Sequence, residues 1–157
     1  MVEKGITEGN IVLEKEANIA ILATRWNSFI VEHLEAGCVD VLERSSPGKA
    51  KVRIIRVPGA FELPVVAKAV AEKGDFDAIV ALGAVIRGTT AHFEHVAGAC
   101  TKGLASVAID TGVPVIFGVL TTDTIEQAVE RAGTKAGNKG AEAGATAIEM
   151  INLLRAL

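Results

Sequence analysis

The stretch between Gly88 and His92 combines residue types that can bind an anion and move a proton. Gly88, Thr89 and Thr90 follow an apolar run and the single residue Arg87, and His92 comes two residues later. Backbone N–H groups at a helix start are unpaired and lie at the positive end of the helix dipole, so a phosphate can bind there. The hydroxyls add donors, and histidine exchanges protons near neutral pH. An ordinary helix N-cap is the alternative.

The glycine spacing around this stretch excludes two nucleotide-binding motifs. Gly83 and Gly88 are spaced as in a Walker A loop, but Thr89 stands where that loop requires its lysine. No GxGxxG pattern occurs. A small phosphorylated substrate is therefore the expected anion. No acidic or cysteine residue is spaced with His92 as in a metal site, so we expect no metal.

The elements that must position these residues alternate between strand and helix. The apolar pattern predicts strands over 18–24, 52–57, 78–86 and 114–120, with a short edge strand over 11–13. It predicts helices over about 26–45, 61–73, 90–110 and 124–133, and a last helix from about 141. This alternation predicts a four-stranded parallel sheet with helices on both faces, an α/β fold. We expect residues 1–10 to be a flexible tail and residues 11–157 to form a single domain.

The predicted strand ends carry aromatic and polar residues close together. Ligands of open parallel sheets bind outside the carboxyl ends of the strands. Trp26 and Asn27 follow the first strand, and Phe61 and Glu62 follow the second. These pairs indicate a ring-stacking site with hydrogen bonds at its edge. Core packing of the two aromatic rings is an equally good interpretation from the pattern alone.

A group of basic residues lies between positions 131 and 139: Arg131, Lys135 and Lys139. They are either solvated helix ends or part of a ligand site, because glycines interleave with them and let a backbone approach a ligand or a neighbouring chain closely. Phe117 lies in the middle of the fourth predicted strand, away from its own strand end. Its position is better explained if it faces the pocket of a neighbouring subunit.

Composition narrows the class of protein. The chain has 157 residues and a net charge of −3, which argues against nucleic-acid binding through a general basic surface. The longest apolar run, 78–86, is far short of the ~20 residues of a membrane span, so we expect no membrane association. No secretory signal is visible, and Cys38 and Cys100 form no disulfide framework. These features favour the cytoplasm.

Five motifs give the sequence a resemblance to a known family over about residues 11–155. They are Arg25-Trp-Asn-Ser-Phe-Ile30, Val57-Pro-Gly-Ala-Phe-Glu-Leu-Pro64, Leu82-Gly-Ala-Val-Ile-Arg-Gly88 with His92, Phe117-Gly-Val-Leu-Thr-Thr122, and the run Glu126–Gly140. With these motifs the chain resembles the lumazine synthases of riboflavin biosynthesis.

The resemblance implies a flavodoxin-like three-layer αβα sandwich that assembles into homopentamers, with active sites between adjacent subunits. It implies condensation of 5-amino-6-(D-ribitylamino)uracil with 3,4-dihydroxy-2-butanone 4-phosphate, giving 6,7-dimethyl-8-ribityllumazine, phosphate and water. No cofactor is expected, and riboflavin synthase is an expected partner. The short connection 133–140 favours an icosahedral shell of pentamers.

The resemblance also implies roles for individual residues. His92 moves protons, and Thr89, Thr90 and Arg131 bind the phosphate. The pyrimidine and ribityl groups contact Trp26, Asn27, Ala60, Phe61, Glu62, Ala84, Val85, Ile86, Phe117 and Lys139. The family places Phe117, Arg131 and Lys139 on the neighbouring chain, which accounts for the mid-strand position of Phe117.

The sequence disfavours two other classes of protein. A shell-forming or flavin-holding protein without catalysis is disfavoured by the intact set of His92, Arg131 and Lys139. A phosphotransfer receiver domain would need an acidic pocket after the first strand, where this chain has Thr24 and Arg25.

Overall fold

A parallel sheet of four strands forms the centre of the computed structural model, which describes residues 1 and 3–157. The order across the sheet is β2-β1-β3-β4, and each neighbouring pair is parallel. This order matches the doubly wound flavodoxin-like arrangement. The strands are β1 (Ala17–Thr24), β2 (Ala50–Val57), β3 (Ala78–Ile86) and β4 (Val115–Thr122). The predicted α/β fold is confirmed.

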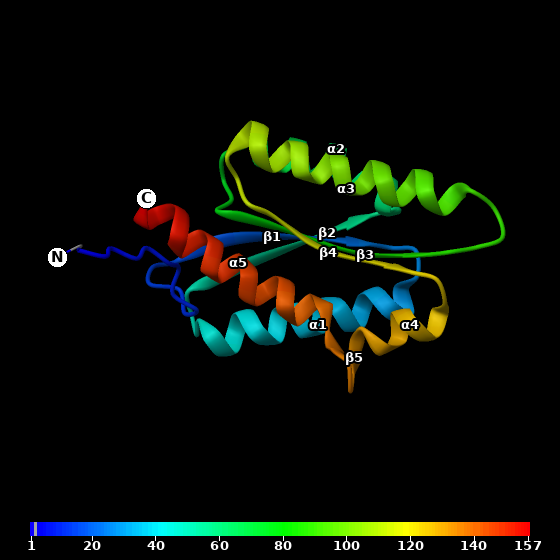
Figure 1. The fold of residues 1–157 in the computed structure, drawn as a ribbon, viewed down its shortest axis with the longest axis horizontal. Helices are drawn as coiled ribbons and strands as arrows, with labels where there is room; N and C mark the ends of the chain where they lie inside the picture. The colour runs from blue at the N-terminus through cyan, green and yellow to red at the C-terminus, as the bar shows by residue number, and fades with distance from the viewer. Residues whose placement is uncertain (2) are drawn as a thin grey trace.

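Helices cover both faces of the sheet, giving three layers (Figure 1). α2 and α3 lie on one face, and α1, α4 and α5 lie on the other. A short 3-10 helix, η1, precedes α2. The bounds are α1 (Ser28–Ser45), η1 (Ala60–Glu62), α2 (Leu63–Glu72), α3 (His92–Thr111), α4 (Ile125–Glu130) and α5 (Lys139–Ala156).

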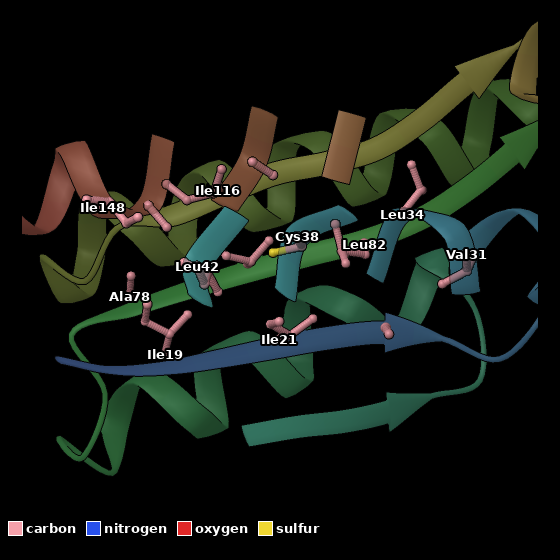
Figure 2. Packing of buried hydrophobic residues seen from close by; sticks show 14 of the residues in the cluster. Ile19, Ile21, Val31, Leu34, Cys38, Leu42, Ala78, Leu82, Ile116 and Ile148 are labelled. Carbon is pink, nitrogen blue, oxygen red and sulfur yellow. The ribbon is translucent and has the colours of Figure 1, made fainter. Parts of the chain in front are cut away.

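Alternate side chains of the central strands pack into two separate hydrophobic cores, one on each face of the sheet. Ile19 and Ile21 of β1 pack with Cys38 and Leu42 of α1 in one core (Figure 2). Their neighbour Leu22 joins the other core, under α2 and α3. Burial on both faces explains why the central strands are apolar at nearly every position, without the alternation of a half-exposed strand.

The predicted edge strand over 11–13 is wrong. The backbone of this segment is bound by side chains and not by a neighbouring strand. Ser46 Oγ accepts from Leu13 N at 3.0 Å, and Asn152 Nδ2 donates to the carbonyl oxygens of Asn10 and Val12 at 2.8 Å. Because these partners come from distant parts of the chain, local periodicity could not reveal them.

A small antiparallel hairpin replaces the predicted end of the fourth helix. α4 stops at Glu130, and β5 (Ala132–Thr134) then pairs with β6 (Gly137–Asn138). Gly133 and Gly137 have φ of 114° and 97°, a region that favours glycine. The hairpin fixes the spacing between Arg131 and the first turn of α5.

Gly140 has a role in the packing of its own chain. A Cβ atom at this position would overlap the carbonyl oxygen of Leu34 and lie 2.7 Å from the Leu34 Cα. The glycine therefore allows α5 to approach α1 closely. Gly144, one turn further along, also faces α1, where an added Cβ would lie 3.0 Å from the carbonyl oxygen of Cys38.

Within the part of the chain that the structure describes, no helix is both long enough and apolar enough to cross a membrane.

Candidate active site

A cavity of about 580 Å³ opens at the carboxyl ends of the strands. The segments after β1 and β2, the end of β3 and the first turns of α3 form its walls. Many of the residues predicted for ligand binding line it: Trp26, Asn27, Ala60, Phe61, Glu62, Ala84, Val85, Ile86, Thr90 and His92. The topology of the parallel sheet thus brings together residues that the sequence spreads over more than sixty positions.

Trp26 presents its ring at the mouth of this cavity. Its side chain is 59% exposed, although its backbone is fixed by a hydrogen bond from Trp26 N to the carbonyl oxygen of Pro58 at 3.1 Å. Phe61 is also 59% exposed and lines the same cavity. Neither ring is buried in the core. Two large exposed aromatic rings at one cavity offer stacking surfaces for a flat ligand.

Asn27 joins the ends of two strands. It has a left-handed backbone conformation, with φ 58° and ψ 40°, and precedes the first residue of α1. Its Nδ2 donates to the carbonyl oxygen of Ala84 at 2.9 Å, so one of its two amide N–H groups is paired within the chain. The backbone at this point turns from β1 into α1 and holds Trp26 beside β3.

Glu62 contributes a carboxylate oxygen without a partner. Its Oε2 is buried and accepts no hydrogen bond from the residues that the structure describes. Leaving a buried acceptor unpaired costs about 1–3 kcal/mol. A ligand carrying hydroxyl groups would supply the missing donor, because Glu62 lines the cavity.

The start of α3 lacks a side-chain cap. Ala91 occupies the N-cap position, and the nearest hydroxyl contact is a long one of 3.4 Å between His92 N and Thr90 Oγ1. The expected alternative, an ordinary N-cap by Thr89 or Thr90, is not formed. Thr90 and His92 line the cavity and are exposed, whereas Thr89 is exposed but does not line it. The helix start therefore offers N–H donors to an anion.

Arg87 is the nearest arginine in sequence to this helix start, but carboxylates engage it. Its Nε donates to Asp123 at 2.9 Å, its Nη1 contacts the Glu94 carboxylate, and its guanidinium carbon lies 4.2 Å from the ring centre of Phe93. The hydrogen bond from Arg87 holds the pKa of Glu94 below its usual value. A phosphate at the start of α3 would need its positive charge from another residue.

Phe117, Arg131 and Lys139 lie elsewhere. They line a second hollow of about 560 Å³ beside β4, α4 and the start of α5. Among the described residues, none lines both cavities. Lys139 Nζ donates to the Glu142 carboxylate at 3.1 Å. The chain therefore carries most of the predicted residues in two separate groups, and Thr89 lines neither cavity.

The sequence pattern missed several residues of the first cavity. Four further residues line it that the sequence analysis does not name as site residues: Gly59, Phe93, His95 and Val96. The three-residue spacing of His92 and His95 on one helix face was the available signal. In the described part of the chain, no cluster of histidine, cysteine and carboxylate side chains is arranged to hold a metal ion.

Comparison with known protein families identifies the family of the chain that carries this cavity. The family model described as 6,7-dimethyl-8-ribityllumazine synthase matches residues 16–155. The chain belongs to this family. It is accordingly an enzyme of riboflavin biosynthesis that condenses 5-amino-6-(D-ribitylamino)uracil with 3,4-dihydroxy-2-butanone 4-phosphate, forming 6,7-dimethyl-8-ribityllumazine, phosphate and water. The resemblance drawn from the sequence motifs is confirmed.

Proposed function

We propose that two subunits build each active site of this lumazine-forming enzyme. One subunit supplies the cavity of Trp26 and His92, and its neighbour supplies the hollow of Phe117, Arg131 and Lys139. The observation that carries the proposal is the separation of these two groups within one chain, with no lining residue in common among the described residues.

The first cavity suits the ribitylaminouracil substrate. The exposed ring of Trp26 would stack on the pyrimidine, and the end of β3, from Ala84 to Ile86, would border it. The ribityl hydroxyls would contact η1, where the unpaired Glu62 oxygen accepts a hydrogen bond. In this arrangement Asn27 contributes by its backbone, its Oδ1 and the second N–H of Nδ2, because the bond to Ala84 uses only one of the two N–H groups.

The start of α3 suits the phosphate of the second substrate. Thr90 and the uncapped backbone N–H groups would donate to it, with Thr89 beside them. Arg131 of the neighbouring subunit would add the positive charge, since Arg87 is engaged by Asp123 and Glu94. No hydrogen bond or ion pair of the Arg131 side chain occurs among the described residues, so the group remains accessible for this role.

The chemistry depends mainly on holding two reactive molecules together. The amine of the pyrimidine attacks the ketone and water leaves as the imine forms. A proton then leaves the carbon between the imine carbon and the phosphate-bearing carbon, the C–H electrons form a C=C bond, and phosphate departs with the electrons of its C–O bond. The resulting enol becomes a ketone by proton transfer, and the second amine closes the ring on this ketone with loss of another water. Fixing both substrates in one cavity supplies much of the rate. His92, exposed at the cavity wall, would carry the proton transfers, typically worth ~10²–10⁴-fold.

The sheet edges support an assembly of copies of this chain. β2 is an edge strand whose Val52 and Ile54 side chains are exposed, and β4 is the other edge, next to the second hollow. Unpaired edges with apolar side chains are usually covered in a stable protein. We propose a homopentamer assembled into an icosahedral shell, which the short 133–140 connection favours. The two buried free thiols fit a reducing compartment, the cytoplasm.

Dilution tests this proposal. Formation of the fluorescent lumazine product, corrected for the spontaneous reaction, should fall together with the assembled fraction measured by light scattering. The molar mass of the undiluted protein, measured by light scattering, distinguishes a pentamer from a shell. Co-purification of riboflavin synthase with this protein tests whether the two are partners. A dissociated subunit that keeps full specific activity would contradict a site built from two chains.

A further inference from the structure

Gly59 lies directly beneath two groups of the first cavity. A Cβ atom built at this position would overlap Cε3 of Trp26, lie 2.5 Å from its Cζ3, and lie 3.2 Å from the buried Oε2 of Glu62. Real Cβ atoms do not approach other atoms as closely as the first two contacts. The indole ring therefore rests on the backbone of Gly59, in the space that any other residue would fill.

The backbone conformation does not require glycine here. Gly59 has φ −146° and ψ 179°, an extended conformation that other residues adopt. The need for glycine comes from contact alone, in contrast to Gly133 and Gly137, whose φ values are positive. An alanine at position 59 is therefore compatible with the local fold but not with the present place of the Trp26 ring.

The ring, and not the backbone, would have to move. Trp26 N is hydrogen-bonded to Pro58 O at 3.1 Å, and Arg25 N to Val57 O at 2.7 Å, so the chain at Trp26 is tied to the end of β2. Asn27 then ties the same turn to β3. The indole is more than half exposed and free to swing outward on its side-chain torsions.

We propose that Gly59 is a positioning residue for the ring substrate. The absence of a side chain at position 59 sets the distance between the Trp26 ring and this substrate, and it sets the direction in which the Glu62 carboxylate points. This proposal rests on the proposed role of the cavity in binding the ribitylaminouracil. The absence of a side chain at position 59 fixes how much space remains between the indole and the opposite wall. A larger residue at this position would change which flat ring the cavity accepts.

Gly59→Ala tests the proposal, with Trp26 as its own reporter. The chain has one tryptophan and no tyrosine, so its emission reports on this ring alone. We expect a shifted emission maximum and about tenfold weaker binding of the lumazine product, read by quenching, since a lost aromatic stack is worth up to ~1.5 kcal/mol. KM should rise for the ribitylaminouracil and stay within about twofold for the phosphorylated substrate. Gly5→Ala, where an added Cβ meets nothing within 4 Å, is the matched control.

A second background separates the contact from a general effect on folding. Phe in place of Trp26 is smaller, so Gly59→Ala should weaken product binding much less in a Trp26→Phe protein than in the wild type. If Gly59→Ala fails to fold alone, it should fold in that background. The proposal would be overturned if Gly59→Ala weakened product binding equally in the two backgrounds, or if it failed to fold in both. It would also be overturned if Gly59→Ala left the Trp26 emission and the affinity for the product unchanged. If the wild-type product binds without quenching Trp26, the proposed substrate site is wrong instead, and the emission of Gly59→Ala still tests the contact.

Discussion

The side chain of Arg87 donates from Nε to the carboxylate of Asp123 over 2.9 Å. This bond joins the loop after β3 to the loop after β4, and the same guanidinium contacts Glu94 in the first turn of α3. The arginine nearest in sequence to the proposed phosphate position is therefore neutralised by two carboxylates. A charge-balanced phosphate site requires a cation from elsewhere, and Arg131 of a neighbouring subunit is the residue that we propose.

Replacing Arg131 should affect one substrate more than the other. We expect Arg131→Ala to raise KM for 3,4-dihydroxy-2-butanone 4-phosphate by about 10–100-fold, because hydrogen bonds to charged groups are worth ~1.5–3 kcal/mol. KM for the ribitylaminouracil should change little. Steady-state kinetics with each substrate varied in turn will measure both. Arg44→Ala, which removes an exposed arginine paired only with Asp40 among the described residues, is the control. Equal losses for the two substrates would argue against the assigned role.

Replacing His92 should slow the reaction without stopping it. Proton transfer by a side chain contributes typically ~10²–10⁴-fold, whereas binding both substrates in one cavity remains in His92→Ala. The expected result is a lower kcat with residual turnover above the spontaneous rate. His33→Ala is a suitable control, because His33 is exposed on α1 and lines neither cavity. A His92→Ala enzyme with unchanged kcat would show that His92 carries no proton.

Stability should decline at alkaline pH through the buried thiols. Burial raises the pKa of Cys38 to about 12, with Glu35 adding to the shift, and burial raises the pKa of Cys100 to about 11, both from 9.0. The unfolded chain therefore loses these protons at lower pH than the folded chain. The stabilisation is complete below pH 9.0 and falls as pH rises toward the folded values.

Urea unfolding at a series of pH values measures this effect. The free energy of unfolding should fall above about pH 9, and less steeply in a Cys38→Ala variant than in the wild type. The comparison between the two proteins removes the contribution of lysines, which both share. Parallel pH dependences would mean that Cys38 does not titrate differently in the two states.

Gly140 and Gly98 should respond oppositely to the same substitution. Gly140→Ala places a Cβ against the Leu34 carbonyl, and we expect a loss of about 3 kcal/mol as α5 moves away from α1. Gly98 lies inside α3 with nothing within 4 Å of an added Cβ, so Gly98→Ala should stabilise the protein by about 0.5–1 kcal/mol. Urea unfolding at one fixed protein concentration gives both values. A well-tolerated Gly140→Ala would mean that the close α1–α5 approach is not required.

The sequence predicted the sheet better than the contacts around the site. β3 was recognisable because burial on both faces leaves only apolar residues from Ala78 to Val85. The helix start predicted at residue 124 agrees with the structure, in which Thr124 Oγ1 accepts from Gln127 N at 3.1 Å and caps α4. Such signals lie within a few residues of one another, so they can be read along the chain.

Long-range pairs could not be predicted in this way. Asn27 and Ala84 are 57 positions apart, and Arg87 and Asp123 are 36 apart, so each contact depends on how the strands align in the folded sheet. The segment 11–13 was misread for the same reason, because Asn152 and Ser46 satisfy its backbone. The position of the Trp26 ring on Gly59 also follows only from the tertiary structure.

Co-assembly of two defective chains tests the shared active site most directly. His92→Ala and Arg131→Ala chains are co-expressed, and lumazine formation is assayed at a low concentration of the phosphorylated substrate. If neighbouring subunits each supply half of a site, random mixing of equal amounts leaves about one interface in four with both halves intact. We predict about a quarter of wild-type activity, well above the sum of the two variants assembled separately and then pooled. Activity no higher than that sum would contradict a site formed between subunits.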